Sequence, residues 1–389
     1  MKLFFPAIFL FLVGCSTSKN TTSSLNSSIE SHVNLIKQQY APDARTAVFT
    51  IEQKGKIIKG ETNIPEAKAS FITRLQSAGI SFIDSIDVLP NAQLQENNFA
   101  VVTISVANLR TQPKHAAELA TQATLGTPLK VLKKSSSWYL VQTPDQYISW
   151  VDAGGIQLHD SATYASWKAK EKIIYTHPFG FVYAYPGSTE NKISDAVYGN
   201  VFELVNKMNG AFEVKFPDGR TGYIPIKEGT VYNVWAKTRK PTEPNFVQTA
   251  KELMGVPYLW GGTSFKGVDC SGFTKTVYFM NGLVLPRDAS QQVNIGTEID
   301  TKNGWDNLKA GDLLFFGTPA KDGKPERVVH VAMWIGNGEF IHASGRVQVA
   351  SLITTAPNYD ASEHKRFLRA KRINTDHVLV DLSKTFLYL

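Results

Sequence analysis

The chain has 389 residues, of which 43% are hydrophobic and 19% are charged, and its formal net charge is +7. This length is enough for two to four domains that each bury a core, and it argues against one compact unit. The composition is typical of folded, β-rich domains and argues against a disordered or coiled-coil protein. The positive charge suits an anionic polymer, but no nucleic-acid-binding motif accompanies it, so we expect no nucleic-acid partner.

The N-terminus has the pattern of a secretion signal. One positive charge at Lys2 precedes an apolar run over residues 3–13, which is too short for a permanent membrane-spanning helix. The sequence Leu12-Val13-Gly14-Cys15 resembles a bacterial lipoprotein processing site, which implies that Cys15 becomes a lipidated N-terminus. We therefore expect residues 1–28 to be a signal peptide and flexible tether. The mature chain would be held on a membrane of the cell envelope by its lipid, facing the periplasm or the exterior.

The chain has only two cysteines, Cys15 and Cys270. If Cys15 carries a lipid, no disulfide can form within the mature chain, and Cys270 is a free thiol. A lone thiol in an exported protein is either a small buried hydrophobe or a reactive nucleophile. The residues around Cys270 must decide between these two interpretations.

Residues 29–95 have the pattern of a small α/β domain. We predict two strands over residues 46–52 and 57–62, a helix over 65–78 and a further strand over 80–88. No residue pattern in this segment points to a particular chemistry.

An internal repeat occupies the middle of the chain. Six positions recur in kind after an interval of 73 residues: Tyr139, Val141, Pro144, Asp145, Trp150 and Val151 return as Phe212, Val214, Pro217, Asp218, Tyr223 and Ile224. Each copy predicts an alternating strand, a Pro-Asp turn and a closing strand, as in small β-barrels. Both copies, at residues 96–160 and 170–238, resemble bacterial SH3-like domains, which lie beside catalytic domains in cell-wall hydrolases. Barrels that only act as spacers are the alternative.

A proline-containing linker over residues 239–245 marks a domain boundary, and the C-terminal domain is predicted over 244–389. After a glycine-rich segment, the sequence Asp269-Cys270-Ser271-Gly272 leads into apolar residues whose spacing predicts one face of a helix. Cys270 is thus predicted at a helix N-terminus. There the free amides and the helix dipole favour negative charge, which would lower the pKa of the thiol and make it reactive.

Two histidines are candidate partners of this thiol. His330 lies in the predicted strand 328–334, and His342 lies in the next predicted strand, 340–343. Antiparallel neighbours on one face would let one ring orient the other. A plain two-residue turn would pair His342 with Met333, on the wrong face, so we expect a longer loop or a bulge near Gly336.

Several motifs of the C-terminal domain resemble those of the NlpC family of papain-like cell-wall cysteine peptidases. They are Pro257-Tyr258-Leu259-Trp260-Gly261-Gly262, Asp269-Cys270-Ser271-Gly272-Phe273, Pro286-Arg287-Asp288, Ala310-Gly311-Asp312-Leu313-Leu314-Phe315-Phe316, His330-Val331 and Ile341-His342-Ala343. The resemblance implies a multidomain fold in which a papain-like α+β peptidase follows two SH3-like β-barrels and the small N-terminal α/β domain. It further implies Cys270 as nucleophile, His330 as base, His342 as orienting residue and Tyr258 beside the oxyanion site, without cofactor or metal. A metal site built from one cysteine and two histidines is the alternative.

Two SH3-like domains before such a peptidase resemble the subgroup that hydrolyses the bond from γ-D-glutamate to a diamino acid in peptidoglycan stem peptides. This resemblance implies that Glu118 and Tyr147 of the first barrel, with Asp288, hold the free amine of an N-terminal L-Ala. Further candidates for substrate contacts are Asp269, Ser271, Arg287 and Ser290. Ala289 departs from the subgroup, which often has serine there, so one hydrogen bond to the substrate is either missing or supplied by Ser290 or Ser271.

Two other functions are compatible with the same sequence. An amidase or acyltransferase of the same fold would use the same cysteine and histidines, whereas a non-catalytic wall-binding lipoprotein would use only the barrels and the positive charge. We expect a monomer whose partners are stem peptides and, through the lipid, a membrane.

Overall fold

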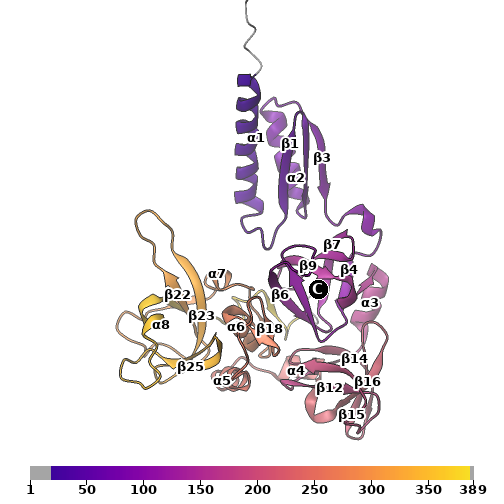
Figure 1. Ribbon diagram of the computed structural model, residues 1–389, viewed down its shortest axis with the longest axis vertical. Coiled ribbons are helices and arrows are strands. Elements are labelled where there is room, and N and C mark those ends of the chain that lie inside the picture. Colours follow the sequence, from indigo (N-terminus) through magenta and orange to yellow (C-terminus); the bar gives the residue numbers. More distant parts are fainter. Residues whose placement is uncertain (1–18, 386–389) are drawn as a thin grey trace, which may run out of the picture. The chain divides into compact units, whose positions relative to one another are not determined.

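The computed structural model describes residues 19–385, and side chains are described from Ile29 onward. The chain divides into two compact units, residues 1–89 and 90–389 (Figure 1). The predicted signal peptide and its Cys15 fall outside the described residues. Among the helices of the described part, none is long and apolar enough to cross a membrane.

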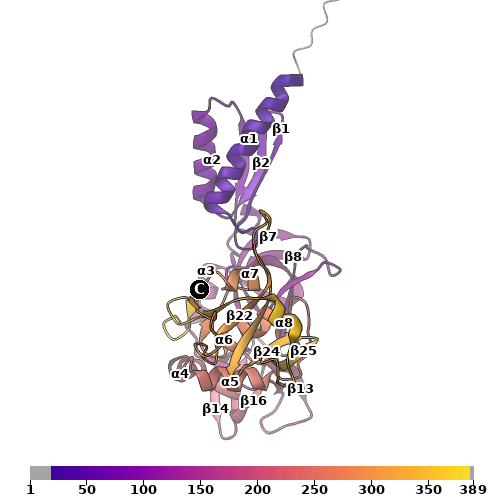
Figure 2. The same ribbon diagram turned by 90° about the vertical axis from the view of Figure 1, so that its left-hand side faces the viewer.

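The first unit combines two helices with a three-stranded sheet. Its elements are α1 (Lys19–Tyr40), β1 (Phe49–Lys54), β2 (Ile57–Thr62), α2 (Pro65–Ser77) and β3 (Ile83–Val88). Strand β2 lies between antiparallel β1 and parallel β3. The two helices lie beside this sheet (Figure 2), and Ile36, Ile58 and Phe71 form part of the core between them.

The predicted flexible tether is wrong for residues 19–28, whose backbone forms the first turns of α1. The polar composition of this segment predicted no structure of its own. However, Ile29, Val33 and Ile36 are buried at helical spacing, and their packing anchors a helix that continues toward the N-terminus.

The second unit contains two β domains with the same topology. The strands of the first are β4 (Phe99–Val102), β5 (Val106–Arg110), β6 (Leu119–Thr124), β7 (Pro128–Ser135), β8 (Trp138–Gln142), β9 (Ile148–Asp152) and β10 (Ile156–His159). Those of the second are β11 (Lys172–Tyr175), β12 (Phe179–Tyr183), β13 (Lys192–Val197), β14 (Val201–Met208), β15 (Ala211–Lys215), β16 (Thr221–Pro225) and β17 (Gly229–Val231). The strand orders are β10-β4-β7-β8-β9-β5-β6 and, read in reverse, β17-β11-β14-β15-β16-β12-β13. Each strand of one sheet therefore has its counterpart at the same place in the other.

The 73-residue repeat of the sequence coincides with this shared topology. Strands β8 and β9 begin at Trp138 and Ile148, and their counterparts β15 and β16 begin 73 residues later, at Ala211 and Thr221. Helix α3 (Ser161–Ala169) connects the two domains, and α4 (Tyr232–Thr238) follows the second.

The C-terminal domain combines helices with a six-stranded antiparallel sheet in the order β21-β26-β22-β23-β24-β25. Its helices are α5 (Glu243–Glu252), α6 (Cys270–Phe279), α7 (Ala289–Gln292) and α8 (Ala361–Arg366). The strands of the sheet are β21 (Thr297–Ile299), β22 (Leu313–Thr318), β23 (Arg327–Gly336), β24 (Glu339–Ser344), β25 (Arg346–Ser351) and β26 (Phe367–Arg372). Two short pairs, β18 (Thr263–Ser264) with β19 (Gly267–Val268) and β20 (Leu283–Val284) with β27 (Val380–Asp381), complete the domain. Figure 1 shows α5, α6 and α7 on one side of this sheet and α8 on the other.

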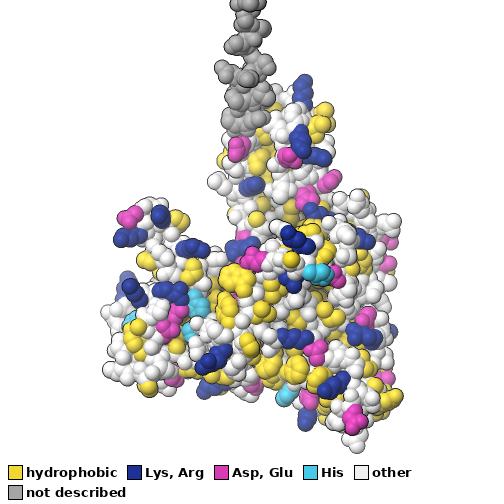
Figure 3. Space-filling model, viewed as in Figure 1, with side chains coloured by type: hydrophobic (Ala, Val, Ile, Leu, Met, Phe, Trp, Pro, Cys, Tyr) yellow, Lys and Arg dark blue, Asp and Glu magenta, His cyan; other side chains and the backbone are white. Residues whose placement is uncertain are grey.

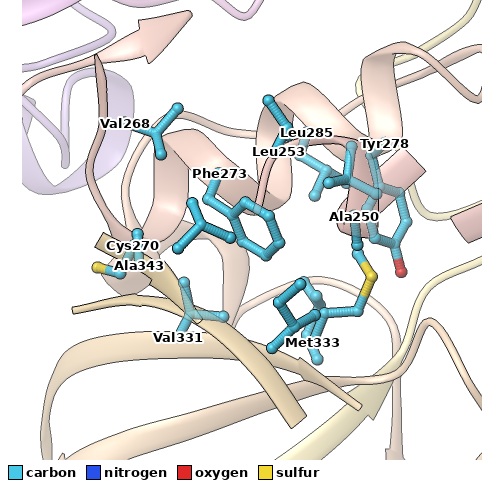
Figure 4. Packing of buried hydrophobic residues seen from close by; sticks show 14 of the residues in the cluster. Ala250, Leu253, Val268, Cys270, Phe273, Tyr278, Leu285, Val331, Met333 and Ala343 are labelled. Carbon is cyan, nitrogen blue, oxygen red and sulfur yellow. The ribbon is translucent and has the colours of Figure 1, made fainter. Parts of the chain in front are cut away.

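The core of this domain forms where α6 packs on β23 and β24. Phe273 and Val277 of α6 are fully buried against Val331, Met333 and Ile341 of the sheet. Figure 4 shows Cys270 at the edge of this cluster, with its sulfur directed away from the packed side chains. The core thus fixes the helix, while its first residue presents a thiol outside it.

Lysine and arginine side chains are spread over the face shown in Figure 3 and are interspersed with acidic ones. The net charge of +7 is therefore not gathered into one basic patch on that face.

Candidate active site

Cys270 is the first residue of α6, as predicted. The carboxylate of Asp269 caps this helix by accepting a hydrogen bond of 2.7 Å from the amide of Gly272. Gly272 must lack a side chain, because a Cβ there would lie 1.9 Å from the carbonyl oxygen of Gly262. The amides of Ser271 and of Val331, which directly follows His330, lie near the thiol and favour its ionised form. The nucleophile candidate is thus held between the helix start and strand β23.

The two histidines are coupled directly, with 2.9 Å between Nε2 of His330 and Nδ1 of His342. Both side chains are buried. The predicted bulge near Gly336 is confirmed: Trp334 pairs with Phe340 and Gly336 with Glu339, which leaves one extra residue in β23. This irregularity brings the rings together across a two-residue turn.

We expected the helix start to lower the pKa of the Cys270 thiol, but burial raises this pKa to about 11. The nearby carboxylate of Asp269 raises it further, while the two amides and Arg287 have the opposite, smaller effect. Burial also lowers the pKa of His330 to about 3 and that of His342 to about 4. The helix start does favour the thiolate, but desolvation outweighs it. At neutral pH, the resting site holds a thiol and two uncharged rings.

We therefore expect alkylation of the folded enzyme by iodoacetamide to be slow at pH 7 and to keep rising, near tenfold per pH unit, up to pH 9. A thiol pKa of about 11 instead of the ordinary 9.0 leaves about a hundredfold less thiolate than in the denatured chain at the same pH. Rate constants for the folded and the denatured chain, measured by mass spectrometry, provide the comparison. A rate that is already level above about pH 6 would show that a thiolate–imidazolium pair exists at rest.

Tyr258 lies close enough to Cys270 for the two to interact electrostatically. Burial raises the pKa of Tyr258 to about 12, with added contributions from the negative charges of Cys270 and Asp269. The phenol therefore keeps its proton at neutral pH and can donate a hydrogen bond beside the thiol. This property suits a group that stabilises an oxyanion.

Asp269, Ser271 and Arg287, predicted to contact substrate, form a buried hydrogen-bonded network next to the nucleophile. The guanidinium of Arg287 is 1% exposed and donates to Asp269 at 2.6 Å, to Ser271 at 3.0 Å and to Thr121 at 2.9 Å. The carboxylate of Asp269 also accepts from the amides of Gly261 and Gly272. These hydrogen bonds hold the Cys270 loop, and the predicted contacts of the three residues with substrate stay a prediction.

Side chains of the first β domain reach the C-terminal domain at both predicted positions. The Tyr147 hydroxyl donates to the Asp288 carboxylate at 3.2 Å. The exposed carboxylate of Glu118 accepts a hydrogen bond of 2.6 Å from the indole of Trp260, in the segment after Tyr258. Asp288 also caps α7, in which Ala289 is buried and Ser290 is exposed.

Sequence reasoning missed three residues that matter here. Gln122 joins the two domains, since its side-chain oxygen accepts from the amide of Thr263 and the hydroxyl of Ser264, each at 3.0 Å. Trp260 contacts Glu118. Its position in the glycine-rich motif next to Tyr258 could have indicated that it lies near the site. Glu363 lies on α8 beside the histidine pair and belongs to no motif.

One group in the described part of the chain could hold a metal ion. The ligand atoms of His330, His342 and Glu363 all lie within 4.8 Å of one another, and all three side chains are buried. In the structure, however, the facing nitrogens of the two rings are already engaged with each other.

A free thiol at a helix start, packed against a sheet that carries two coupled histidines, is the active-site arrangement of a cysteine peptidase. Residues 255–366 match the model of the NlpC/P60 family, and residues 109–156 match that of the bacterial dipeptidyl-peptidase Sh3 domain. The chain belongs to the NlpC/P60 family, a family of cysteine peptidases that hydrolyse peptidoglycan.

Two curated relatives extend this similarity beyond the peptidase domain. A gamma-D-glutamyl-L-lysine dipeptidyl-peptidase from Bacillus cereus is 31% identical over 265 residues, which cover 65% of this chain and 77% of the relative. A protein of the same name from Bacillus subtilis is 29% identical over 238 residues, which cover 58% and 72%. The crystal structure of an NlpC/P60 family protein from Bacillus cereus superposes with a TM-score of 0.59 at 26% identity, over 70% of this chain and 99% of that one.

Proposed function

We propose that this protein is a γ-D-glutamyl to diamino acid endopeptidase that acts on stem peptides with a free N-terminal L-Ala. The observation that carries this proposal is the pairing of Tyr147 with Asp288 across the domain junction, with Glu118 near the same catalytic domain. Carboxylates and a phenol grouped at a domain junction suit an ammonium group, and a domain that closes one end of the substrate site would exclude a longer, glycan-linked chain. The activity named for the two Bacillus relatives supports the same substrate class.

The proposed chemistry is covalent catalysis by Cys270. As the sulfur attacks the γ-glutamyl carbonyl carbon, its proton passes to His330, and the carbonyl electron pair moves to oxygen. The backbone amide of Cys270 and the hydroxyl of Tyr258 stabilise that oxygen. His330 then gives the proton to the departing amine as the C–N bond breaks, and water hydrolyses the resulting thioester. The lowered pKa of His330 keeps the ring in its basic form before the attack.

Two other functions compete with this one. An amidase or acyltransferase would use the same thiol and histidines but would release different products, which mass spectrometry of wall digests distinguishes. A non-catalytic wall-binding protein would sediment with insoluble wall whether or not Cys270 is present, and it would cleave nothing.

Replacing Glu118 with glutamine should lower kcat/KM for the tripeptide L-Ala-γ-D-Glu-diamino acid by about a hundredfold, since the substrate ammonium loses an ionic partner. The melting temperature should stay unchanged because Glu118 is exposed in the free enzyme. Glu118 is a cleaner probe than Asp288, which also caps α7.

The matched control is Glu96→Gln, which removes a carboxylate from another exposed position of the same unit and should leave kcat/KM as in the wild type. If Glu118→Gln and Glu96→Gln cleave the tripeptide equally well, the carboxylate of Glu118 does not bind the ammonium.

A further inference from the structure

Glu363 is a buried carboxylate beside the histidine pair. It lies on the short helix α8, where its own amide donates to the capping carboxylate of Asp360 at 3.0 Å. Its Oε1 is 3.9 Å from Nε2 of His330, and the side chain of Glu363 is 7% exposed. A carboxylate so poorly hydrated needs a compensating interaction.

The hydrogen bond between the two rings fixes where the protons must lie if His330 is the base. Its Nδ1 must then be the unprotonated nitrogen, so Nε2 carries the proton and donates to Nδ1 of His342. The proton of His342 consequently lies on Nε2, a buried atom without a hydrogen-bond partner among the described residues. His342 can therefore orient His330, but as a neutral ring it brings no negative charge to balance a protonated His330.

Glu363 can supply that charge. Burial raises the pKa of the Glu363 carboxyl above its ordinary value, and the nearby Asp360 adds to this, whereas the guanidinium of Arg366 donates to Oε1 and favours the ionised carboxylate. Its other oxygen, Oε2, is buried and has no hydrogen-bond partner in the described part of the chain. The carboxylate is thus held by one arginine and is not saturated with hydrogen bonds.

We propose that Glu363 is a positioning residue that stabilises the imidazolium of His330 formed when Cys270 attacks, and that keeps the His330–His342 pair in its orientation. This inference rests on the proposed thiol chemistry. During the attack the thiol proton moves to Nδ1 of His330, while the proton on Nε2 stays between His342 and Glu363. Glu363 remains ionised throughout and exchanges no proton.

Glu363→Gln keeps the size of the side chain and a hydrogen-bond acceptor for Arg366, but removes the charge. We expect kcat on the tripeptide to fall about thirtyfold while KM changes by less than about twofold, because the carboxylate acts on the charge that develops in the transition state. Glu363→Asp, which retains the charge, should recover about tenfold of that loss, and it also provides a variant if the glutamine form does not fold.

A second measurement keeps this inference separate from the choice of substrate. Acylation of Cys270 by p-nitrophenyl acetate needs the same proton transfer to His330 but no stem peptide, and Glu363→Gln should slow it about tenfold. If the wild type acylates but does not cut the tripeptide, the proposed substrate is wrong, while the role of Glu363 is still measured.

The matched control is Glu326→Gln, since Glu326 is likewise paired with an arginine, Arg369 of β26 at 2.5 Å. It should leave kcat and the acylation rate as in the wild type. The proposal is overturned if Glu363→Gln keeps both rates within twofold of the wild type. It is also overturned if Glu326→Gln slows them equally, or if Glu363→Asp is no faster than Glu363→Gln.

Discussion

Replacing Cys270 with alanine is expected to lower peptide cleavage about ten-thousandfold or more while the chain stays folded. In the proposed mechanism the sulfur of Cys270 is the atom that bonds to the substrate, and alanine cannot form the thioester. The fold should survive because the sulfur points away from the core cluster and alanine retains the Cβ (Figure 4). Product formation by mass spectrometry, with circular dichroism as the check on folding, measures both effects.

The control for this experiment is treatment of the wild type with a chelator, which should change nothing. Metal-dependent hydrolysis would use the buried group of His330, His342 and Glu363, and it would respond in the opposite way. Full activity of Cys270→Ala, or loss of wild-type activity with the chelator, contradicts the thiol mechanism.

Replacing Arg287 with methionine is expected to lower the free energy of unfolding by about 3–5 kcal/mol. The change leaves the carboxylate of Asp269 buried next to the nucleophile without its charged partner, and it also removes the hydrogen bond to Thr121 of the first β domain. The melting temperature should fall by about 10 °C for a unit of this size, as calorimetry would show.

Arg369→Met is the matched control, because that guanidinium pairs with Glu326 while remaining 33% exposed. Exposed ion pairs contribute about 1 kcal/mol or less, so this variant should melt close to the wild type. Equal melting temperatures for Arg287→Met and Arg369→Met would mean that the buried network does not stabilise the fold.

Local sequence patterns predicted the features of the site that depend on neighbours in the chain. The spacing after Cys270 predicted a helix start, and the position of His342 relative to the turn required a bulge, which the register shift of β23 confirms. The 73-residue repeat predicted two similar β domains, whose strand orders agree. Each of these inferences uses the periodicity of a helix, a strand or a repeat.

Features that depend on tertiary packing could not be predicted in the same way. The sequence predicted that Arg287 contacts substrate, but it did not reveal that Arg287 is buried in hydrogen bonds with Thr121 and Asp269, which are distant in sequence. The raised pKa of Cys270 likewise follows from desolvation, which local sequence does not reveal. Glu363 lies on a six-residue helix without any motif, and only the folded chain brings it to His330.

The most direct test of the proposed function compares three substrates of the same enzyme: the tripeptide L-Ala-γ-D-Glu-diamino acid, its N-acetylated form, and an intact muropeptide whose stem is still joined to the glycan. Mass spectrometry would give kcat/KM for each. We predict that acetylation and the glycan each reduce cleavage by about a hundredfold or more, since both remove the ammonium that Glu118, Tyr147 and Asp288 are proposed to bind. Cleavage of the muropeptide as fast as the free tripeptide would contradict the proposed requirement for a free N-terminal amine.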